Sequence, residues 1–293
     1  ALRCCAEGGY EQFIRFWWLQ LQFVVGVPMS AVTIFIEAIG LCGPGLDGWR
    51  NSEAVLRDES NFQLAATKIA VSECLPAAER RRVGVGVKLA LACSADALAS
   101  STYIASDLIS VFSSSGGDGD NCHVICEALA SSDRSISPTR FTNSVHNAPS
   151  GYWGIALRAR QASTSLCAFD GSFSAGFLEA CTQAVTADAP VILIAYDTPY
   201  PEPLRAVRPI LHCMGVTLLI SPRRTPQSIA KVQVSLGQSK VDEMQHADLE
   251  ALRQNVPAAR SLPLLSAIAN KNKYAELALD LFSNQQLQLK VEI

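Results

Sequence analysis

Four short runs of apolar, largely β-branched residues most constrain what this chain can fold into. They lie at residues 32–39, 107–113, 190–196 and 215–220. Nearly continuous apolar runs of this length are typical of strands that are buried on both faces of a sheet. Segments of helical character lie between and around them, at 49–57, 83–99, 121–131 and 168–187. The sequence therefore predicts an α/β fold whose sheet is covered by helices on both faces.

The length and composition agree with a folded chain. Of its 293 residues, 49% are hydrophobic and 17% are charged, which is enough to bury a substantial core. We divide the chain into an N-terminal extension outside the fold, a main domain and a short C-terminal segment that completes the sheet, at residues 1–28, 29–222 and 223–293. Met29, just before the first strand, is a candidate natural start. In the C-terminal segment we expect one helix at 263–282 and one strand at 287–293.

The charge balance excludes a broadly basic nucleic-acid-binding protein. The chain has 24 Lys and Arg residues against 27 Asp and Glu residues, and its dense basic run is confined to residues 80–82. The apolar run at 13–27 is interrupted by Arg15, and it is shorter than the roughly 20 residues of a spanning helix. We therefore expect no membrane association, with a structural protein attached to membranes through residues 13–27 as an alternative.

The ten cysteines do not have the dense spacing of a small disulfide scaffold. Five of them lie inside apolar stretches: Cys74, Cys93, Cys167, Cys181 and Cys213. A reduced thiol in such a position behaves as a small hydrophobic group. This usage predicts a reducing, cytoplasmic location.

Several short motifs are better explained as structure than as chemistry. Residues 43–48 read Gly-Pro-Gly-Leu-Asp-Gly, but no strand with a ribose-binding acid follows at the dinucleotide-binding distance, so we interpret them as a turn. The Cys122-His123-x-x-Cys126 cluster lacks the fourth ligand of a closed zinc site. The Gly- and Asp-rich loop at 116–121 lacks the terminal glutamate of a calcium loop, and Asp120 or Asn121 is expected to cap the next helix. No Gly-x-Ser-x-Gly serine-hydrolase motif occurs. We expect no metal and no cofactor.

Residues 136–176 are more informative. They begin with Ile-Ser-Pro, continue through an Asn-rich turn from Asn147 to Gly151, and lead through small and hydroxyl residues into a glycine-punctuated helix. This segment resembles the nucleophile region of the β-ketoacyl-acyl-carrier-protein synthases of the thiolase-like superfamily. The resemblance covers residues 31–235. It is most similar to the ketosynthase-like N-terminal family of aryl-polyene-type systems, which includes chain-length-factor-like subunits, and it implies a truncated, thiolase-like α/β/α fold.

The resemblance also shows a departure at the nucleophile. In active ketosynthases the catalytic Cys lies three residues before the first helix glycine and eight before the second, and counting back from Gly171 and Gly176 gives Ala168. A methyl group cannot attack a thioester. The neighbouring Cys167 would be rotated by about 100° at the start of a helix, so we expect it to be a packed core residue. The two later histidine motifs of the family have no counterpart in the residues after 220.

These features predict a non-catalytic, chain-length-factor-like subunit. The resemblance implies that it forms a heterodimer with an active β-ketoacyl synthase in fatty-acid, polyketide or aryl polyene synthesis, and that it meets the acyl carrier protein through that complex. The loop at 139–147 would then reach the partner's acyl tunnel. Candidates for shaping the tunnel or the interface are Phe141, Asn143, His146 and Phe169. The alternative is an active condensing or acyl-transfer enzyme that uses Cys167 as its nucleophile.

Overall fold

The computed structural model describes residues 31–71, 73–271 and 273–293. The predicted extension at 1–28, the candidate start at Met29 and the apolar run at 13–27 lie outside these residues. Val32–Ile293 form one compact unit. In the described part of the chain, no helix has the length and apolarity of a membrane span.

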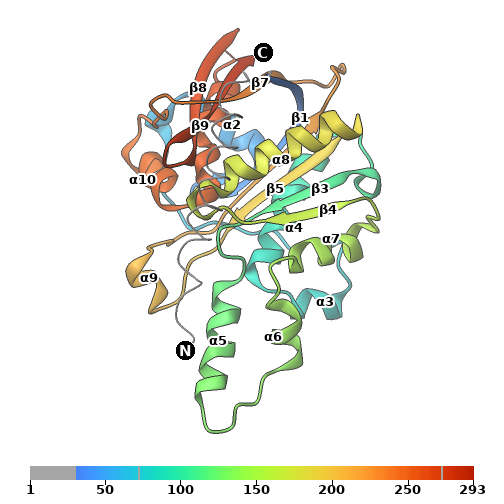
Figure 1. The fold of residues 1–293 in the computed structure, drawn as a ribbon, viewed down its shortest axis with the longest axis vertical. Helices are drawn as coiled ribbons and strands as arrows, with labels where there is room; N and C mark the ends of the chain where they lie inside the picture. The colour runs from blue at the N-terminus through green and yellow to red at the C-terminus, as the bar shows by residue number, and fades with distance from the viewer. Residues whose placement is uncertain (1–30, 72, 272) are drawn as a thin grey trace, which may run out of the picture. The chain divides into compact units, whose positions relative to one another are not determined.

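A mixed sheet of nine strands runs through the described residues (Figure 1). Its strand order is β4-β3-β5-β6-β1-β7-β9-β8, and β2 pairs with the end of β1. The neighbours β3–β4 and β3–β5 are parallel, and the other pairs are antiparallel. The strands are β1 (Val32–Gly43), β2 (Leu46–Asp47), β3 (Ile109–Ser113), β4 (Ser163–Leu166), β5 (Val191–Asp197), β6 (Met214–Ser221), β7 (Ala230–Gly237), β8 (Tyr274–Phe282) and β9 (Gln285–Glu292).

Helices cover both faces of this sheet, which confirms the predicted α/β class. The α-helices are α2 (Trp49–Arg57), α3 (Ala77–Arg82), α4 (Val85–Ala99), α5 (Gly119–Ala130), α6 (Pro138–Asn143), α7 (Ala148–Leu157), α8 (Ser172–Ala187), α9 (Leu204–Val207), α10 (Ala247–Asn255) and α11 (Leu262–Ala269). Short 3-10 turns are η1 (Glu59–Asn61), η2 (Ala105–Asp107), η3 (Phe169–Gly171) and η4 (Pro257–Ser261).

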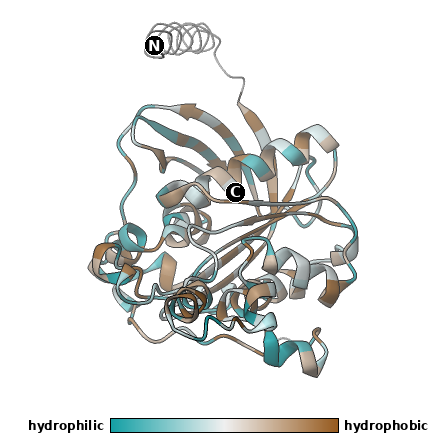
Figure 2. Ribbon diagram, turned by 60° about the horizontal axis from the view of Figure 1, so that its bottom comes forward, coloured by the Kyte–Doolittle hydropathy of each residue, from teal (hydrophilic) through white to brown (hydrophobic). Residues whose placement is uncertain are grey.

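The alternation of side chains along the strands divides the apolar residues into two cores. On β5, Val191, Leu193 and Ala195 face the core that includes α8, α10 and α11. The intervening residues of the same strand, among them Ile192 and Ile194, face the second core, with α4 and α7. Because both faces are covered, the central strands are hydrophobic along their length, as Figure 2 shows.

Helix α4 packs closely on the sheet because of a glycine. A Cβ atom at Gly40 would lie 1.9 Å from the main-chain oxygen of Cys93 on α4, so no larger residue fits without moving the helix. This contact belongs to β1, which continues to Gly43, beyond the predicted end at residue 39. The Gly-Pro-Gly sequence that follows forms the tight turn between β1 and β2, as the structural interpretation of residues 43–48 predicted.

The C-terminal prediction was wrong in several elements. The helix expected at 263–282 ends at Ala269, and the remaining residues form β8, which pairs with β9. Leu277, Leu279 and Leu281 alternate along β8 and face the core, so the period is that of a strand although Ala, Glu and Leu are good helix formers. The segment after residue 222 thus adds three strands and two α-helices rather than one helix and one strand.

Two further corrections concern residues 118–157. The cap of α5 is Asp118, whose carboxylate accepts a hydrogen bond from the Asn121 main-chain N–H, rather than Asp120 or Asn121. The sequence predicts no helix between Pro138 and Gly151, but this stretch contains α6 and the start of α7. Helices α5 and α6 lie side by side, joined by a hydrogen bond from Asn121 to the main-chain oxygen of Arg140, and extend away from the sheet (Figure 1). We call residues 119–143 the α5–α6 arm.

Candidate active-site turn

The carboxyl ends of the parallel strands β3, β4 and β5 meet at one edge of the sheet. Ser114 and Ser115 follow β3, Cys167 and Ala168 follow β4, and Asp197 ends β5. Ligand and active sites of parallel sheets are found at this edge, because the connecting loops converge there. The sequence resemblance placed the nucleophile position, Ala168, at this same point.

Ala168 lies in a strand–turn–helix connection and borders an open cavity of about 520 Å³. The turn residues up to Gly171 form one wall, and the hairpin of β8 and β9 forms the other. Gly171 permits this close approach, because a Cβ atom there would lie 2.0 Å from the main-chain oxygen of Leu281. The residue at the expected nucleophile position therefore presents a methyl group at the edge of a cavity.

The main-chain N–H of Ala168 is already engaged. It donates a hydrogen bond of 3.0 Å to Oγ of Ser172, and this hydroxyl donates one of 2.6 Å to the main-chain oxygen of Phe169. In acyl-transfer enzymes, main-chain N–H groups beside the nucleophile commonly stabilise the oxyanion. Here the Ala168 N–H already donates to the hydroxyl oxygen of Ser172. Sequence reasoning did not identify Ser172, although it lies only four positions after Ala168.

Cys167 is exposed, so the prediction that it packs in the core was wrong. Its thiol donates a hydrogen bond of 3.1 Å to the main-chain oxygen of Ser115, and Cys167 is not among the residues that line the cavity. The error arose because residues 167 and 168 precede the first helical turn, which starts at Phe169. Cys93 and Cys181 are buried as expected, and burial raises the pKa of the Cys93 thiol to about 12.

Three of the four histidines have polar partners other than Cys167. Nε2 of His146 lies 3.1 Å from the main-chain oxygen of Ser114, and Nε2 of His123 lies 3.2 Å from Glu127. Nδ1 of His246 accepts a hydrogen bond from the main-chain N–H of Asp248. Over the described ranges, no hydrogen bond joins a histidine to the Cys167 thiol, and no group of three His, Cys, Asp or Glu residues is arranged to hold a metal ion.

The four residues predicted to shape a tunnel or an interface do not form one group. Asn143 and His146 line the same narrow gap beside Gly117, and the side-chain amide of Asn143 donates to the main-chain oxygen of Arg82. Phe169 borders the cavity next to Ala168 and is 62% exposed. Phe141 is 66% exposed on the α5–α6 arm.

Phe169 has a left-handed backbone, with φ of 51°, which is unusual for a residue other than glycine. The guanidinium group of Arg208 stacks 3.9 Å from the centre of its ring, and also bonds Asp170 at 2.6 Å and the hydroxyl of Tyr200 at 2.8 Å. These contacts hold the turn that carries Ala168 in place.

Ion pairs connect the same turn to the C-terminal segment. Arg260 lies 3.4 Å from Asp170 and 3.1 Å from Asp280, and Asp280 is bonded by Arg253 at 2.6 Å. Neither the arginines nor Asp280 were identified from the sequence, because residues so far apart in the chain give no local signal.

Asp197 is a buried carboxylate at the centre of this edge, also missed by sequence reasoning. It accepts hydrogen bonds from the main-chain N–H and the hydroxyl of Ser115, and from the main-chain N–H of Ala258. Burial raises the pKa of Asp197 to about 6, although the Ser115 and Ala258 hydrogen bonds and the positive charge of Arg208 oppose this rise.

Comparison with known proteins shows which solved structures share this fold. Solved structures with the same fold include a chain of a ketosynthase in complex with its chain length factor from Xenorhabdus doucetiae (TM-score 0.67, 20% identity, 88% of this chain and 98% of that chain). A chain of the ishigamide ketosynthase/chain length factor also matches (TM-score 0.69, 12% identity, 89% and 99%). So does a chain of a type II polyketide synthase complex, in which an acyl-carrier protein is bound to its ketosynthase (TM-score 0.72, 9% identity, 89% and 99%). A comparison with curated proteins gives no match.

Residues 49–280 match the family described as beta-ketoacyl synthase, N-terminal domain. The chain belongs to this family, as the resemblance in residues 136–176 indicated. The match extends beyond residue 235, where the resemblance seen in the sequence ended, and it includes Asp197, Arg260 and Asp280.

The raised pKa of Asp197 predicts a specific pH dependence of stability. A carboxyl group whose pKa is higher in the folded state favours folding when it is protonated. The free energy of unfolding should therefore fall as the pH rises from about 4 to about 6. Relative to Asp197→Asn, which cannot titrate there, the wild type should lose about 2 kcal/mol over this range, measured by urea denaturation at a series of pH values. A constant difference between the two curves would contradict this, and Asp133→Asn, at an exposed position, serves as the control.

Proposed function

We propose that this chain is a non-catalytic ketosynthase-like subunit of the chain-length-factor type. In this role it pairs with an active β-ketoacyl synthase in the cytoplasm, in fatty-acid, polyketide or aryl polyene synthesis, and meets the acyl carrier protein through that complex. The observation that carries the proposal is Ala168, which stands where the resemblance expects the nucleophilic cysteine and borders the cavity next to β8. Since a methyl group forms no thioester, the acyl chain has to be attached elsewhere.

The surroundings of Ala168 support the same proposal. Ser172 occupies the main-chain N–H that would stabilise an oxyanion at this position. The thiol of Cys167 donates its hydrogen bond to a carbonyl oxygen, which is not a general base. Nucleophilic catalysis by a cysteine needs a thiolate or a base within hydrogen-bond reach.

A free sheet edge supports pairing with a second subunit. Strand β4 ends the sheet and pairs only with β3 within the described residues. The main-chain N–H groups of Ser110 and Ser114 donate hydrogen bonds to the main-chain oxygens of Ala162 and Leu166. Since successive residues of a strand turn their main-chain groups to opposite sides, Ser163 and Ser165 direct theirs to the outer edge. An edge of this kind can pair with a strand of another chain.

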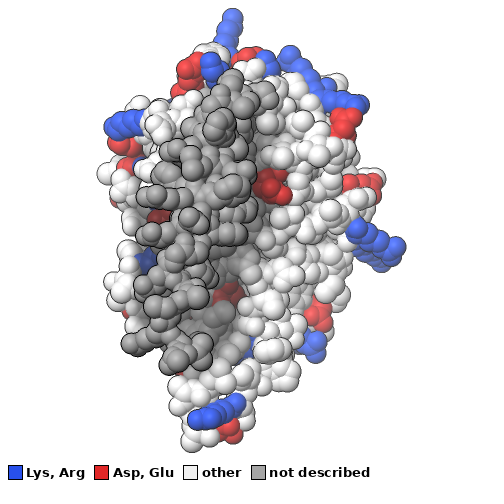
Figure 3. Space-filling view, in the orientation of Figure 1, with Lys and Arg blue, Asp and Glu red and all other residues white. Residues whose placement is uncertain are grey.

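The α5–α6 arm supplies a second surface for such a partner. Leu129 and Phe141 on the arm, and Val145 just after it, are between 50% and 66% exposed and offer apolar contact surface to a partner. Figure 3 shows that the visible surface of the arm is largely uncharged above its tip. The relatives with this fold include chains from complexes of a ketosynthase with its chain length factor, which agrees with pairing.

Labelling with a cysteine-directed acyl-mimic inhibitor distinguishes a non-catalytic subunit from an enzyme that uses Cys167 as its nucleophile. Cys122, Cys126 and Cys167 are all exposed. The proposal predicts that Cys167 reacts no faster than Cys126, because neither has a base, as measured by peptide mass spectrometry. Selective labelling that disappears in Cys167→Ala and persists in Cys126→Ala would instead support an active condensing or acyl-transfer enzyme.

Pairing through the free edge can be tested by co-expression with an active ketosynthase of the same organism. We expect the two chains to co-purify as a heterodimer, and Ser165→Pro to weaken the complex by roughly tenfold or more, since it removes one outward N–H group but spares the pairing with β3. Ser165→Ala, which loses the hydroxyl alone, is the matched control. The proposed edge is wrong if Ser165→Pro, with an unchanged circular dichroism spectrum, pairs as tightly as Ser165→Ala. Failure of the wild type to co-purify would contradict the proposed subunit role itself.

A further inference from the structure

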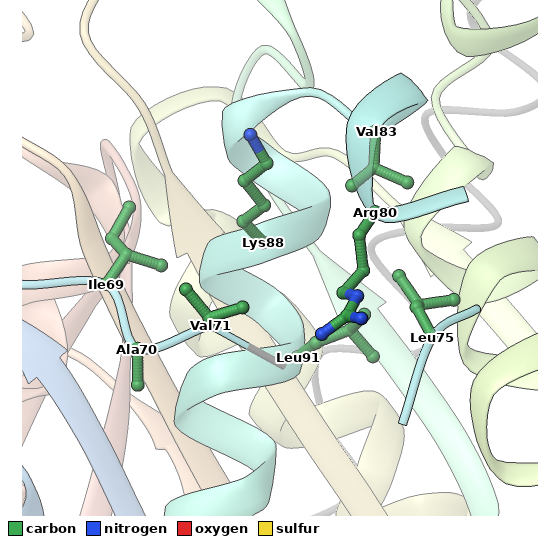
Figure 4. Close-up of a pocket in the computed structure, with 8 residues that line it drawn as sticks. All are labelled: Ile69, Ala70, Val71, Leu75, Arg80, Val83, Lys88 and Leu91. Atoms are coloured by element: carbon green, nitrogen blue, oxygen red, sulfur yellow. The ribbon is translucent and has the colours of Figure 1, made fainter. Parts of the chain in front are cut away.

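A second pocket lies away from the turn at Ala168, between α3, the start of α4 and the loop before α3 (Figure 4). Its volume is about 350 Å³, and it shares no lining residue with the cavity at Ala168. The residues that line it are Ile69, Ala70, Val71, Leu75, Arg80, Val83, Lys88 and Leu91. We call it the α3–α4 pocket.

Six of these eight residues have purely hydrocarbon side chains, and the other two are cations. Among the described lining residues, the side chains thus offer a ligand no hydrogen-bonding group apart from Arg80 and Lys88. A peptide segment would lose main-chain hydrogen bonds on entering such a pocket, whereas a hydrocarbon chain would not. The lining fits a ligand that is apolar over most of its length.

Arg80 makes the pocket favourable for a ligand that carries a negative charge. Its side chain is half-buried, and its guanidinium group extends over the apolar residues (Figure 4). Among the described residues it forms no ion pair and no side-chain hydrogen bond, whereas Arg82 on the same helix pairs with Glu79 at 3.2 Å. A half-buried guanidinium group with five N–H donors and no acceptor is a favourable site for a carboxylate. Lys88, also without an ion pair in the described ranges, contributes a second positive charge from α4.

We infer that the α3–α4 pocket binds a medium-chain fatty carboxylate. The hydrocarbon chain packs between the loop at 69–71, Leu75 and Leu91, and the carboxylate pairs with Arg80. The volume is within the range of small-molecule sites, and the Arg80 guanidinium group matches one anionic end group. This inference does not depend on the proposed subunit role, since the pocket is separate from the turn at Ala168.

Isothermal titration calorimetry of the full chain with decanoate tests the inference. We expect saturable binding with a Kd below about 1 mM, and a loss of roughly tenfold or more in Arg80→Gln, because a charge-assisted hydrogen bond is removed. The matched control is Arg81→Gln, since Arg81 is exposed on the same helix and does not line the pocket. Val71→Asp, a change at a 77% exposed position that does not disturb the core, should weaken binding through repulsion and a less apolar pocket.

Three results would overturn the inference. These are no saturable binding of decanoate to the wild type, an equal loss in Arg80→Gln and Arg81→Gln, and binding of decanol as tight as that of decanoate. Butyrate, which keeps the charge but lacks most of the chain, should bind at least tenfold more weakly than decanoate.

Discussion

The buried carboxylate of Asp197 holds together the edge of the sheet where the candidate site lies, and the arrangement of the site depends on it. Asp197 is inaccessible to solvent, and burying its charge is costly unless hydrogen bonds compensate it. Its partners come from two distant parts of the chain, Ser115 after β3 and Ala258 in η4. The main-chain oxygens of Ser114 and Ser115 are hydrogen-bonded to His146 and Cys167. Asp197 therefore joins this loop to the C-terminal segment, which becomes part of the candidate site.

Several contacts hold the turn at Ala168 in one conformation. Arg208 and Arg260 bond the turn through Asp170, and Gly171 lets the β8 strand approach it closely. Ser172 then closes the turn by accepting the Ala168 N–H. The methyl group that these contacts place at the edge of the cavity cannot attack an acyl group.

The sequence allowed the central part of the fold to be predicted well. The strands at 190–196 and 215–220 and the helix at 49–57 were found within a residue or two, because continuous apolar runs and helical spacing are local signals. Strand β8 was missed because its residues favour a helix, while its actual conformation is set by pairing with β9. Helices α6 and α7 were missed because residues 138–151 lack apolar periodicity.

Sequence reasoning reached the candidate site only through a motif of the family. The glycine spacing located Ala168, which the structure places at the cavity, but the spacing gave no information on Asp197, Arg208 or Arg260, which reach the turn from other strands and loops. The exposure of Cys167 was not predicted, because it depends on the extended backbone before η3 rather than on the composition around it.

The most direct test of the central claim is a condensation assay of the purified chain alone, with acyl- and malonyl-thioesters of an acyl carrier protein as substrates and mass spectrometry of the products. The account predicts no β-ketoacyl product above the uncatalysed background until an active ketosynthase is added. Turnover by the isolated chain at an ordinary enzymatic rate, on the order of 10 per second, would contradict it.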